Sequence, residues 1–271
     1  MCSSDLERKQ AEERLQRAQA QLTDRAGQLQ GLVTERTSEL TSANNQLEAF
    51  VYSIAHDLRA PLRAMRTFST MLLEESGAVM NEASKDYTER IGQSAQFMDA
   101  LLTDLLAFSR ISQLNVELTS INLKTVVESV LSRLQEDLQE KHAHVESPGP
   151  WPFVQAHEPT LAQVLFNLVG NALKFVKPGA RPVVRLRAEE QAEFIRVWVE
   201  DDGPGIAPGH QAQIFKPFMR LEGDKYGGTG IGLAIVQKGV ERMGGQVGVE
   251  SIPGRGCRFW FELKKAKAMN G

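Results

Sequence analysis

The sequence predicts a helical N-terminal part, a coiled coil followed by a dimeric four-helix bundle, and then an α+β part built as an α/β sandwich. Residues 1–147 contain a single proline and four glycines, whereas residues 148–271 contain the other ten prolines and 18 of the 22 glycines. Helix interiors exclude proline and disfavour glycine. Apolar residues recur at helical spacing in the first part, and they alternate in the second as they do in strands.

Heptad spacing in the first 54 residues supports the coiled coil. Apolar residues lie seven apart at Leu15, Leu22 and Leu29, and again at Leu40, Leu47 and Ile54. The eleven residues from Leu29 to Leu40 are one heptad plus four, which is a stutter between two blocks. A helix this polar does not bury its apolar stripe alone, so we expect a parallel two-stranded coiled coil. A solvated single helix or a linker is the alternative.

A second amphipathic run, from Asp86 to about Ile111, has apolar residues at spacings near three and four. Between the two runs we expect a loop from Ser76 to Ser84, with a helix start at Asn81 and Glu82. Two antiparallel helices form a hairpin, and two hairpins from two chains form a four-helix bundle. The sequence therefore predicts a homodimer.

From Trp151 onward the pattern alternates between helix and strand. We expect helices over Glu158–Phe175 and Ile231–Met243, and strands over Pro182–Glu189, Glu193–Glu200, Gln246–Ser251 and Cys257–Leu263. Short strands with helices segregated between them favour an α+β sandwich over a doubly wound parallel sheet.

Composition excludes several classes of protein. A net charge of −3 provides no basic field for nucleic acid. Cys2 and Cys257 lie at opposite ends of the chain, which excludes a disulfide scaffold and favours a reducing compartment, so we expect the cytoplasm. No apolar stretch approaches the length of a membrane span. His142 and His144 have the spacing of a metal pair, but a solvated strand edge is the favoured interpretation.

The segment Ser53–Leu62 contains a histidine at the outermost heptad position. With Ile54 at d, His56 falls at f and faces solvent beside Asp57. Neutral imidazole is a good nucleophile, and a neighbouring carboxylate fixes its tautomer and takes its proton. Pro61 should bend the helix just past this histidine. A surface histidine beside a surface aspartate, with a chance proline, is the alternative.

Three further segments predict a nucleotide pocket. Asn167, Asn171 and Lys174 share one helix face, and two amides with an ammonium suit hydrated Mg²⁺ and phosphates. In Asp201–Ile206, a carboxylate at a strand end can accept a hydrogen bond from an exocyclic amine, and glycines allow the backbone to approach a flat base. Gly228–Leu233 is a glycine loop that opens a helix, which makes an anion site. Neither a Rossmann unit nor a GxxxxGK[ST] loop is present.

In order and spacing, these segments resemble the catalytic core of bacterial sensor histidine kinases, closest to the phytochrome-like or multi-sensor subgroup. The resemblance runs from about Gln46 to Leu263. The H, N, first glycine, F and second glycine boxes of that family resemble, in this order, Ser53–Leu62, Asn167–Phe175, Asp201–Ile206, Ile214–Phe218 and Gly228–Leu233. The beginning, Asp5–Glu13, resembles the exit of a PAS-type sensor domain, so we expect a longer receptor with an upstream sensor domain.

The resemblance implies an ATP-dependent protein-histidine kinase with ATP and Mg²⁺. His56 would accept the γ-phosphoryl group, Asp57 would orient its ring, and Asn171 would bind Mg²⁺. Asp201 would read adenine. The residues implied in ATP binding are Asn167, Asn171, Lys174, Asp201, Gly203, Gly205, Arg220, Gly228, Thr229, Gly230, Gly232 and Leu233. In bifunctional relatives, Thr or Asn holds the hydrolytic water four residues after the histidine, whereas this chain has Ala60.

The resemblance also implies an organisation and partners. We expect a signalling helix over 1–45, a dimerisation and phosphotransfer hairpin over 46–114, an ATP-binding domain over 115–265 and a tail over 266–271. A hinge would lie in Arg110–Ser120 and a lid in Ala207–Gly227. A response-regulator receiver domain would take the phosphoryl group. The alternatives are a degenerate kinase acting as a scaffold or phosphatase, and another member of the ATPase superfamily, such as a chaperone or mismatch-repair protein.

Overall fold

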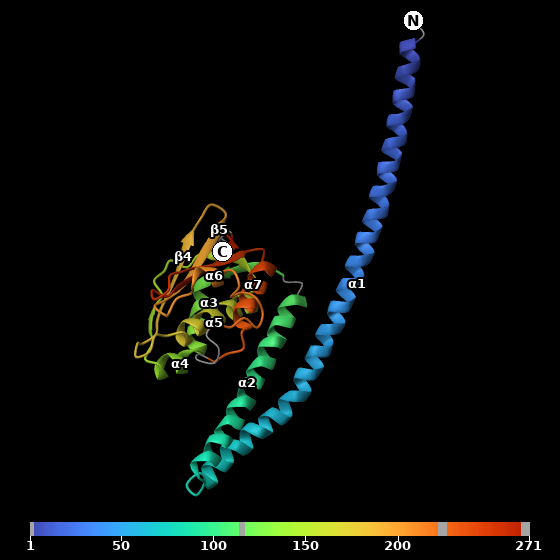
Figure 1. The fold of residues 1–271 in the computed structure, drawn as a ribbon. Coiled ribbons are helices and arrows are strands. Elements are labelled where there is room, and N and C mark those ends of the chain that lie inside the picture. The colour runs from blue at the N-terminus through green and yellow to red at the C-terminus, as the bar shows by residue number, and fades with distance from the viewer. Residues whose placement is uncertain (1–2, 114–116, 222–226, 267–271) are drawn as a thin grey trace. The chain divides into compact units, whose positions relative to one another are not determined.

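The computed structural model describes residues 3–113, 117–221 and 227–266, and the chain divides into two units, Met1–Ser53 and Ile54–Gly271. The helices are α1 (Ser3–Ser76), α2 (Glu82–Gln113), α3 (Leu123–Arg133), α4 (Gln135–Glu140), α5 (Glu158–Lys174), α6 (Pro208–Gln211) and α7 (Gly232–Arg242). The strands are β1 (Thr119–Asn122), β2 (His144–Glu146), β3 (Phe153–Ala156), β4 (Val183–Glu190), β5 (Phe194–Asp201), β6 (Gln246–Ser251) and β7 (Cys257–Lys264) (Figure 1).

The first unit is the N-terminal part of α1. Its described apolar side chains face solvent, with Leu22 66% and Leu29 62% exposed. The side chains of Leu15, Leu40 and Leu47 lie outside the described residues. The coiled coil and its stutter therefore stay predictions. Among the helices in the described ranges, none combines the length and apolar character needed to cross a bilayer.

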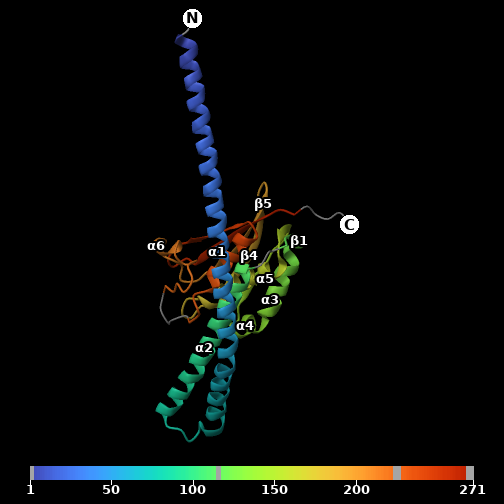
Figure 2. The ribbon, with the colours of Figure 1, turned by 90° about the vertical axis from the view of Figure 1, so that its right-hand side faces the viewer.

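In the second unit, the end of α1 and α2 form the predicted antiparallel hairpin (Figures 1 and 2). The side chain of Asn81 caps α2, since its Oδ1 accepts a 2.8 Å hydrogen bond from the backbone N–H of Ser84. Small and branched side chains are buried between the two helices, at Ala55, Leu62, Ala95, Leu102 and Leu106. Helix α1 continues through Pro61. The hairpin thus presents the segment around His56 on a continuous helix.

A mixed five-stranded sheet in the order β2-β4-β5-β7-β6 forms the rest of this unit, with β1 and β3 paired separately. Only β2 and β4 are parallel; the other pairs are antiparallel. Helices α5 and α7 pack on the sheet and on each other, and α3 packs on α5. The α+β sandwich is therefore confirmed. The six elements expected after Trp151 are present within one or two residues of their predicted ends.

Alternating burial along β5 and β7 shows why this sheet forms. Along β7, buried and half-buried residues alternate from Cys257 to Leu263, because successive side chains point to opposite faces. The inward side chains share one buried core with the apolar face of α5, which buries eight residues. Asp201 ends β5 and pairs with Cys257 at the start of β7. This register fixes one wall of the site.

Candidate active site

The imidazole of His56 stands on the hairpin surface. Its side chain is 74% exposed, and its Nδ1 lies 3.2 Å from Oδ1 of Asp57, which is 77% exposed. This placement agrees with the predicted outer heptad position. If Nδ1 carries the proton and donates a hydrogen bond to the Asp57 carboxylate, the lone pair of Nε2 is free for nucleophilic attack.

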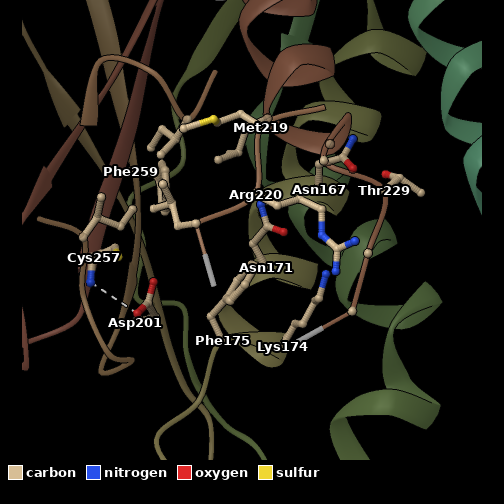
Figure 3. A pocket seen from close by; sticks show the side chains of 18 of the residues that line it. Asn167, Asn171, Lys174, Phe175, Asp201, Met219, Arg220, Thr229, Cys257 and Phe259 are labelled. Carbon is tan, nitrogen blue, oxygen red and sulfur yellow. Dashed lines mark hydrogen bonds between the residues drawn. The ribbon is translucent and has the colours of Figure 1, made fainter. Parts of the chain in front are cut away.

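A second site is a cavity of about 310 Å³ between α5, the segment after β5, the glycine loop before α7, and α2 (Figure 3). All of the predicted pocket residues except Gly203 line it. Figure 3 shows Asp201 and Cys257 on one side of the cavity and Lys174, Arg220 and Thr229 on the other. The cavity therefore has two chemically different ends.

The first end is apolar with one carboxylate. Asp201 is 8% exposed, and its Oδ1 accepts backbone hydrogen bonds from Gly203 N at 2.8 Å and Cys257 N at 3.2 Å. Burial raises the pKa of Asp201 to about 6, against the lowering effect of these hydrogen bonds. Because Oδ1 is already engaged, Oδ2 is the oxygen left for a ligand. Aliphatic and aromatic side chains of Ile206, Ile214, Leu233 and Phe259 line the cavity around it.

Gly203 does not line the cavity but lies directly against Asp201 and Phe175, two residues that do. A Cβ at this position would lie 2.3 Å from the carbonyl oxygen of Phe175 and 2.7 Å from Oδ1 of Asp201. Only glycine allows the chain to pass this close while its N–H holds the carboxylate. Its role is thus to position Asp201.

The other end is rich in donors. Lys174 ends α5, and a Cβ on Gly228, whose φ is +97°, would come within 1.9 Å of its Nζ. Burial lowers the pKa of Lys174, and the positive charge of Arg220 lowers it further. Helix α7 begins just after the glycine loop, so its free N–H groups face the same space. Two cations and a helix N-terminus together suit an anion.

Asn167 and Asn171 lie between the two ends. The side-chain amide of Asn167 donates to the carbonyl of Gln163 at 2.9 Å, which turns its Oδ1 towards Gly232. The side chain of Asn171, one turn further along α5, points into the cavity (Figure 3). In the described ranges, no group of three or more His, Cys, Asp or Glu is placed to hold a metal ion.

Sequence reasoning missed the cavity residues that come from β7 and from α2. Cys257, expected only to pack in its strand, lines the cavity; burial raises the pKa of its thiol to about 12, so it is not a nucleophile here. Asp104 and Ala100 reach the cavity from α2. Cys257 pairs with Asp201 across strands β5 and β7. Had this register been known, the prediction of Asp201 as a site residue would have indicated Cys257 as well. Nothing in the sequence around Asp104 marks it.

Two family matches cover both sites. Residues 46–114 match the family described as His Kinase A (phospho-acceptor) domain. Residues 156–267 match the family described as Histidine kinase-, DNA gyrase B-, and HSP90-like ATPase. This chain is a histidine kinase catalytic core. The His56 segment lies in the first match, and the cavity residues from Asn167 onward lie in the second.

Relatives agree with this assignment. The kinase core is 32% identical over 225 residues to the phytochrome-like protein Cph1 of Synechocystis sp., a match covering 83% of this chain and 30% of Cph1. It is 34% identical over 265 residues to sensor histidine kinase AruS of Pseudomonas aeruginosa, covering 89% and 26%. The chain thus spans less than a third of these relatives.

A solved structure also resembles the kinase core. The crystal structure of full-length ShkA in complex with AMPPNP superimposes with a TM-score of 0.62 at 29% identity. This similarity covers 80% of this chain and 46% of ShkA. This similarity supports the assignment at the level of structure as well as sequence.

Proposed function

We propose that this kinase core transfers the γ-phosphoryl group of ATP to His56 and then to an aspartate of a response-regulator receiver domain. The observation that carries the proposal is the pairing of two sites in one chain. One is an exposed histidine with a carboxylate on its Nδ1; the other is a cavity with a carboxylate at its apolar end and cations at its polar end. The first is a nucleophile and the second is a nucleotide site.

The two ends of the cavity set the direction of the nucleotide. Oδ2 of Asp201 would accept a hydrogen bond from the adenine amine, with the ring between aliphatic side chains. The phosphates would then lie towards Lys174, Arg220 and the N–H groups of Gly228–Gly230. Phosphoryl transfer requires mainly positioning and charge neutralisation, which these cations and N–H groups provide.

Mg²⁺ fits the donor set between these two ends. Mg²⁺ prefers oxygen ligands, keeps several waters and is usually bound together with substrate phosphates. Asn171 would hold it through its amide oxygen, as its position in the cavity supports. When bound, the ion would neutralise phosphate charge.

The transfer to His56 forms one bond and breaks one. Nε2 attacks the γ-phosphorus, a P–N bond forms, and the bond from the γ-phosphorus to the bridging oxygen of ADP breaks. The ring becomes positively charged, and the Asp57 carboxylate stabilises the proton on Nδ1.

The cavity must approach His56 for this step. The expected hinge, Arg110–Ser120, includes residues 114–116, and the expected lid includes residues 222–226; both sets lie outside the described residues.

We also propose a homodimer built on the hairpin. Large apolar side chains are exposed on both of its helices, at Leu58, Met65, Phe68, Met71, Leu72, Ile91, Phe97 and Met98. A second hairpin would bury them in a four-helix bundle. The domain limits 1–45, 46–114, 115–265 and 266–271 and an upstream sensor domain belong to the same proposal.

One experiment separates the kinase from the degenerate-kinase alternative. The chain is incubated with ATP labelled on its γ-phosphate, and the label on the protein is then exposed to acid and to base. We expect label that is lost in acid and stable in base, as for a phosphorylated histidine. A scaffold or a pure phosphatase acquires no label.

Nucleotide affinity should depend on pH through Asp201. The ionised carboxylate is the hydrogen-bond acceptor, and burial raises its pKa to about 6 in the free protein. Affinity is therefore retained above this value and falls as the pH drops through it. We expect adenosine, which carries no phosphate to titrate, to bind about tenfold more weakly one pH unit below that pKa. A flat profile between pH 5 and 8 would exclude Asp201 as the titrating acceptor.

Phosphatase activity towards the regulator should be weak. Ala60 lies one helical turn after His56 and is exposed, so its methyl group offers no hydrogen bond to a hydrolytic water. The side chain of Arg59, next to Ala60 in the sequence, points across the hairpin to Asp99, with its Nε 3.7 Å from Oδ1 of Asp99. We expect Ala60→Thr to speed the decay of the phosphorylated regulator by about tenfold or more. The assay uses a His56→Gln background to block back-transfer, and an equal rate in both chains would disprove the role of this position.

A further inference from the structure

The hairpin places a carboxylate of its own at the polar end of the cavity. Oδ2 of Asp104, on α2, accepts a 2.5 Å hydrogen bond from Oγ1 of Thr229 in the glycine loop. Asp104 lines the cavity beside Lys174 and Gly228. Burial raises the pKa of Asp104, while the Thr229 hydrogen bond and the charge of Lys174 oppose this rise. A half-buried carboxyl group thus lies where the proposed function places phosphate.

Apolar packing holds Asp104 in this position. Ile111 on α2 forms a buried cluster with Ile231 and Ile235 at the start of α7. Leu101 and Leu105, on either side of Asp104 in sequence, pack against the same cluster together with Ala107 and Phe108. Helix α2 therefore contacts the segment that also supplies the phosphate-binding N–H groups. The packing of α2 on α7 therefore also places Asp104 in the proposed phosphate subsite.

We infer that Asp104 is a built-in competitor of the nucleotide phosphates. While α2 lies against α7, the Asp104 carboxylate accepts the hydrogen bond of Thr229 and interacts with the charge of Lys174. Phosphate groups would need the same two partners, so phosphate binding and the packing of α2 on α7 oppose each other. The inference rests on the proposed ATP function and adds a regulation of that site. By reciprocity, ATP weakens the α2–α7 contact by the same factor by which the contact weakens ATP.

Charge decides the size and the selectivity of this effect. A carboxylate and a phosphate a few ångströms apart repel each other. Movement of α2 and solvent screening reduce what is measured. The repulsion acts on the phosphates and leaves the base end, where Asp201 lies, unaffected. Adenosine should therefore be insensitive to Asp104, and ATP should be sensitive.

The test compares Asp104→Asn with the native chain by calorimetry, using ATP with Mg²⁺ and, separately, adenosine. Asparagine keeps an acceptor for Thr229 and removes only the charge. Glu89→Gln is the matched control, because Glu89 is an exposed carboxylate on the same helix, away from the cavity. We expect Asp104→Asn to bind ATP about three- to tenfold more tightly, adenosine to be unchanged, and the control to match the native chain for both.

A second variant tests the link to docking. Ile111→Ala removes apolar contact with α7 without touching the cavity, so it should also tighten ATP binding. Both substitutions relieve one competition, so the double variant should gain little beyond Asp104→Asn alone. Gains that multiply fully, or no gain for Ile111→Ala, would show that the carboxylate and the docking are independent.

The outcomes also distinguish the two proposals. A native chain that binds neither ATP nor adenosine overturns the proposed function and this inference with it. A native chain that binds both, with unchanged or weaker ATP binding in Asp104→Asn, overturns only the role of Asp104. Equal tightening of ATP and adenosine would also overturn it, because charge competition acts on the phosphates alone.

Discussion

Replacing His56 by glutamine is expected to abolish phosphorylation of the chain while leaving ATP affinity nearly unchanged. Glutamine has a similar length and polarity but no nucleophilic ring nitrogen, so no P–N bond forms. The imidazole is not among the residues that line the cavity. Its side chain is 74% exposed, so the free energy of unfolding should change by no more than about 0.5 kcal/mol. Label incorporation from ATP and calorimetric ATP binding measure the two effects separately.

The chain offers a close control for this substitution. His144 is also an exposed histidine paired with a carboxylate, with Nε2 3.2 Å from Oε1 of Glu146 and a side chain 68% exposed. It lies on β2, at the edge of the sheet. His144→Gln should therefore leave phosphorylation at the native level. Residual labelling of His56→Gln, or loss of nucleotide affinity in it, would contradict the assignment of two separate sites.

The sequence predicted the hairpin and the later strands because their patterns are local. The exposure of His56 followed from a heptad position, and the strands from Gln246 to Leu263 followed from alternation around a Pro-Gly turn. Such patterns depend only on side-chain periodicity, which the chain shows directly.

The segment between the hairpin and α5 was the main gap. Helix α3 buries Leu123, Val126, Val127 and Val130, a spacing of three and four that is typical of a helix, although no helix was predicted there. Strands β1, β2 and β3 are three or four residues long, too short for alternation to be distinguished from chance. Strand β2 is recognisable only through its parallel partner β4.

The site residues also fall into those that a local pattern predicts and those that only the tertiary structure brings together. Asn167, Asn171 and Lys174 share a helix face that the sequence shows, and the structure places all three at the cavity. Asp104 and Cys257 reach the cavity through tertiary packing and strand register, which one sequence does not show. Asp104, on which the inferred regulation rests, is therefore a residue that only the tertiary structure brings to the site.

Replacing Asp201 by asparagine should cost most of the affinity for ATP. Oδ1 of Asp201 is held by the N–H groups of Gly203 and Cys257. The asparagine oxygen would stay with these donors and its NH₂ would face the adenine amine, which sets donor against donor. A hydrogen bond to a charged group contributes about 1.5–3 kcal/mol, so we expect roughly a 10- to 100-fold loss. Asp202→Asn is the control, because this carboxylate is 51% exposed and binds Arg185 instead.

A change of base distinguishes lost recognition from lost structure. Inosine triphosphate carries a carbonyl oxygen where ATP carries the amine, and this oxygen can accept a hydrogen bond from the asparagine NH₂. Asp201→Asn should therefore bind inosine triphosphate at least as well as the native chain does, so its preference for ATP narrows or inverts. Removing the buried charge also relieves a desolvation cost, since the pKa of Asp201 is raised to about 6 by burial. The variant should accordingly be no less stable than the native chain near neutral pH. Equal losses for both nucleotides, with a lowered melting temperature, would show that Asp201 supports the fold and does not read the base.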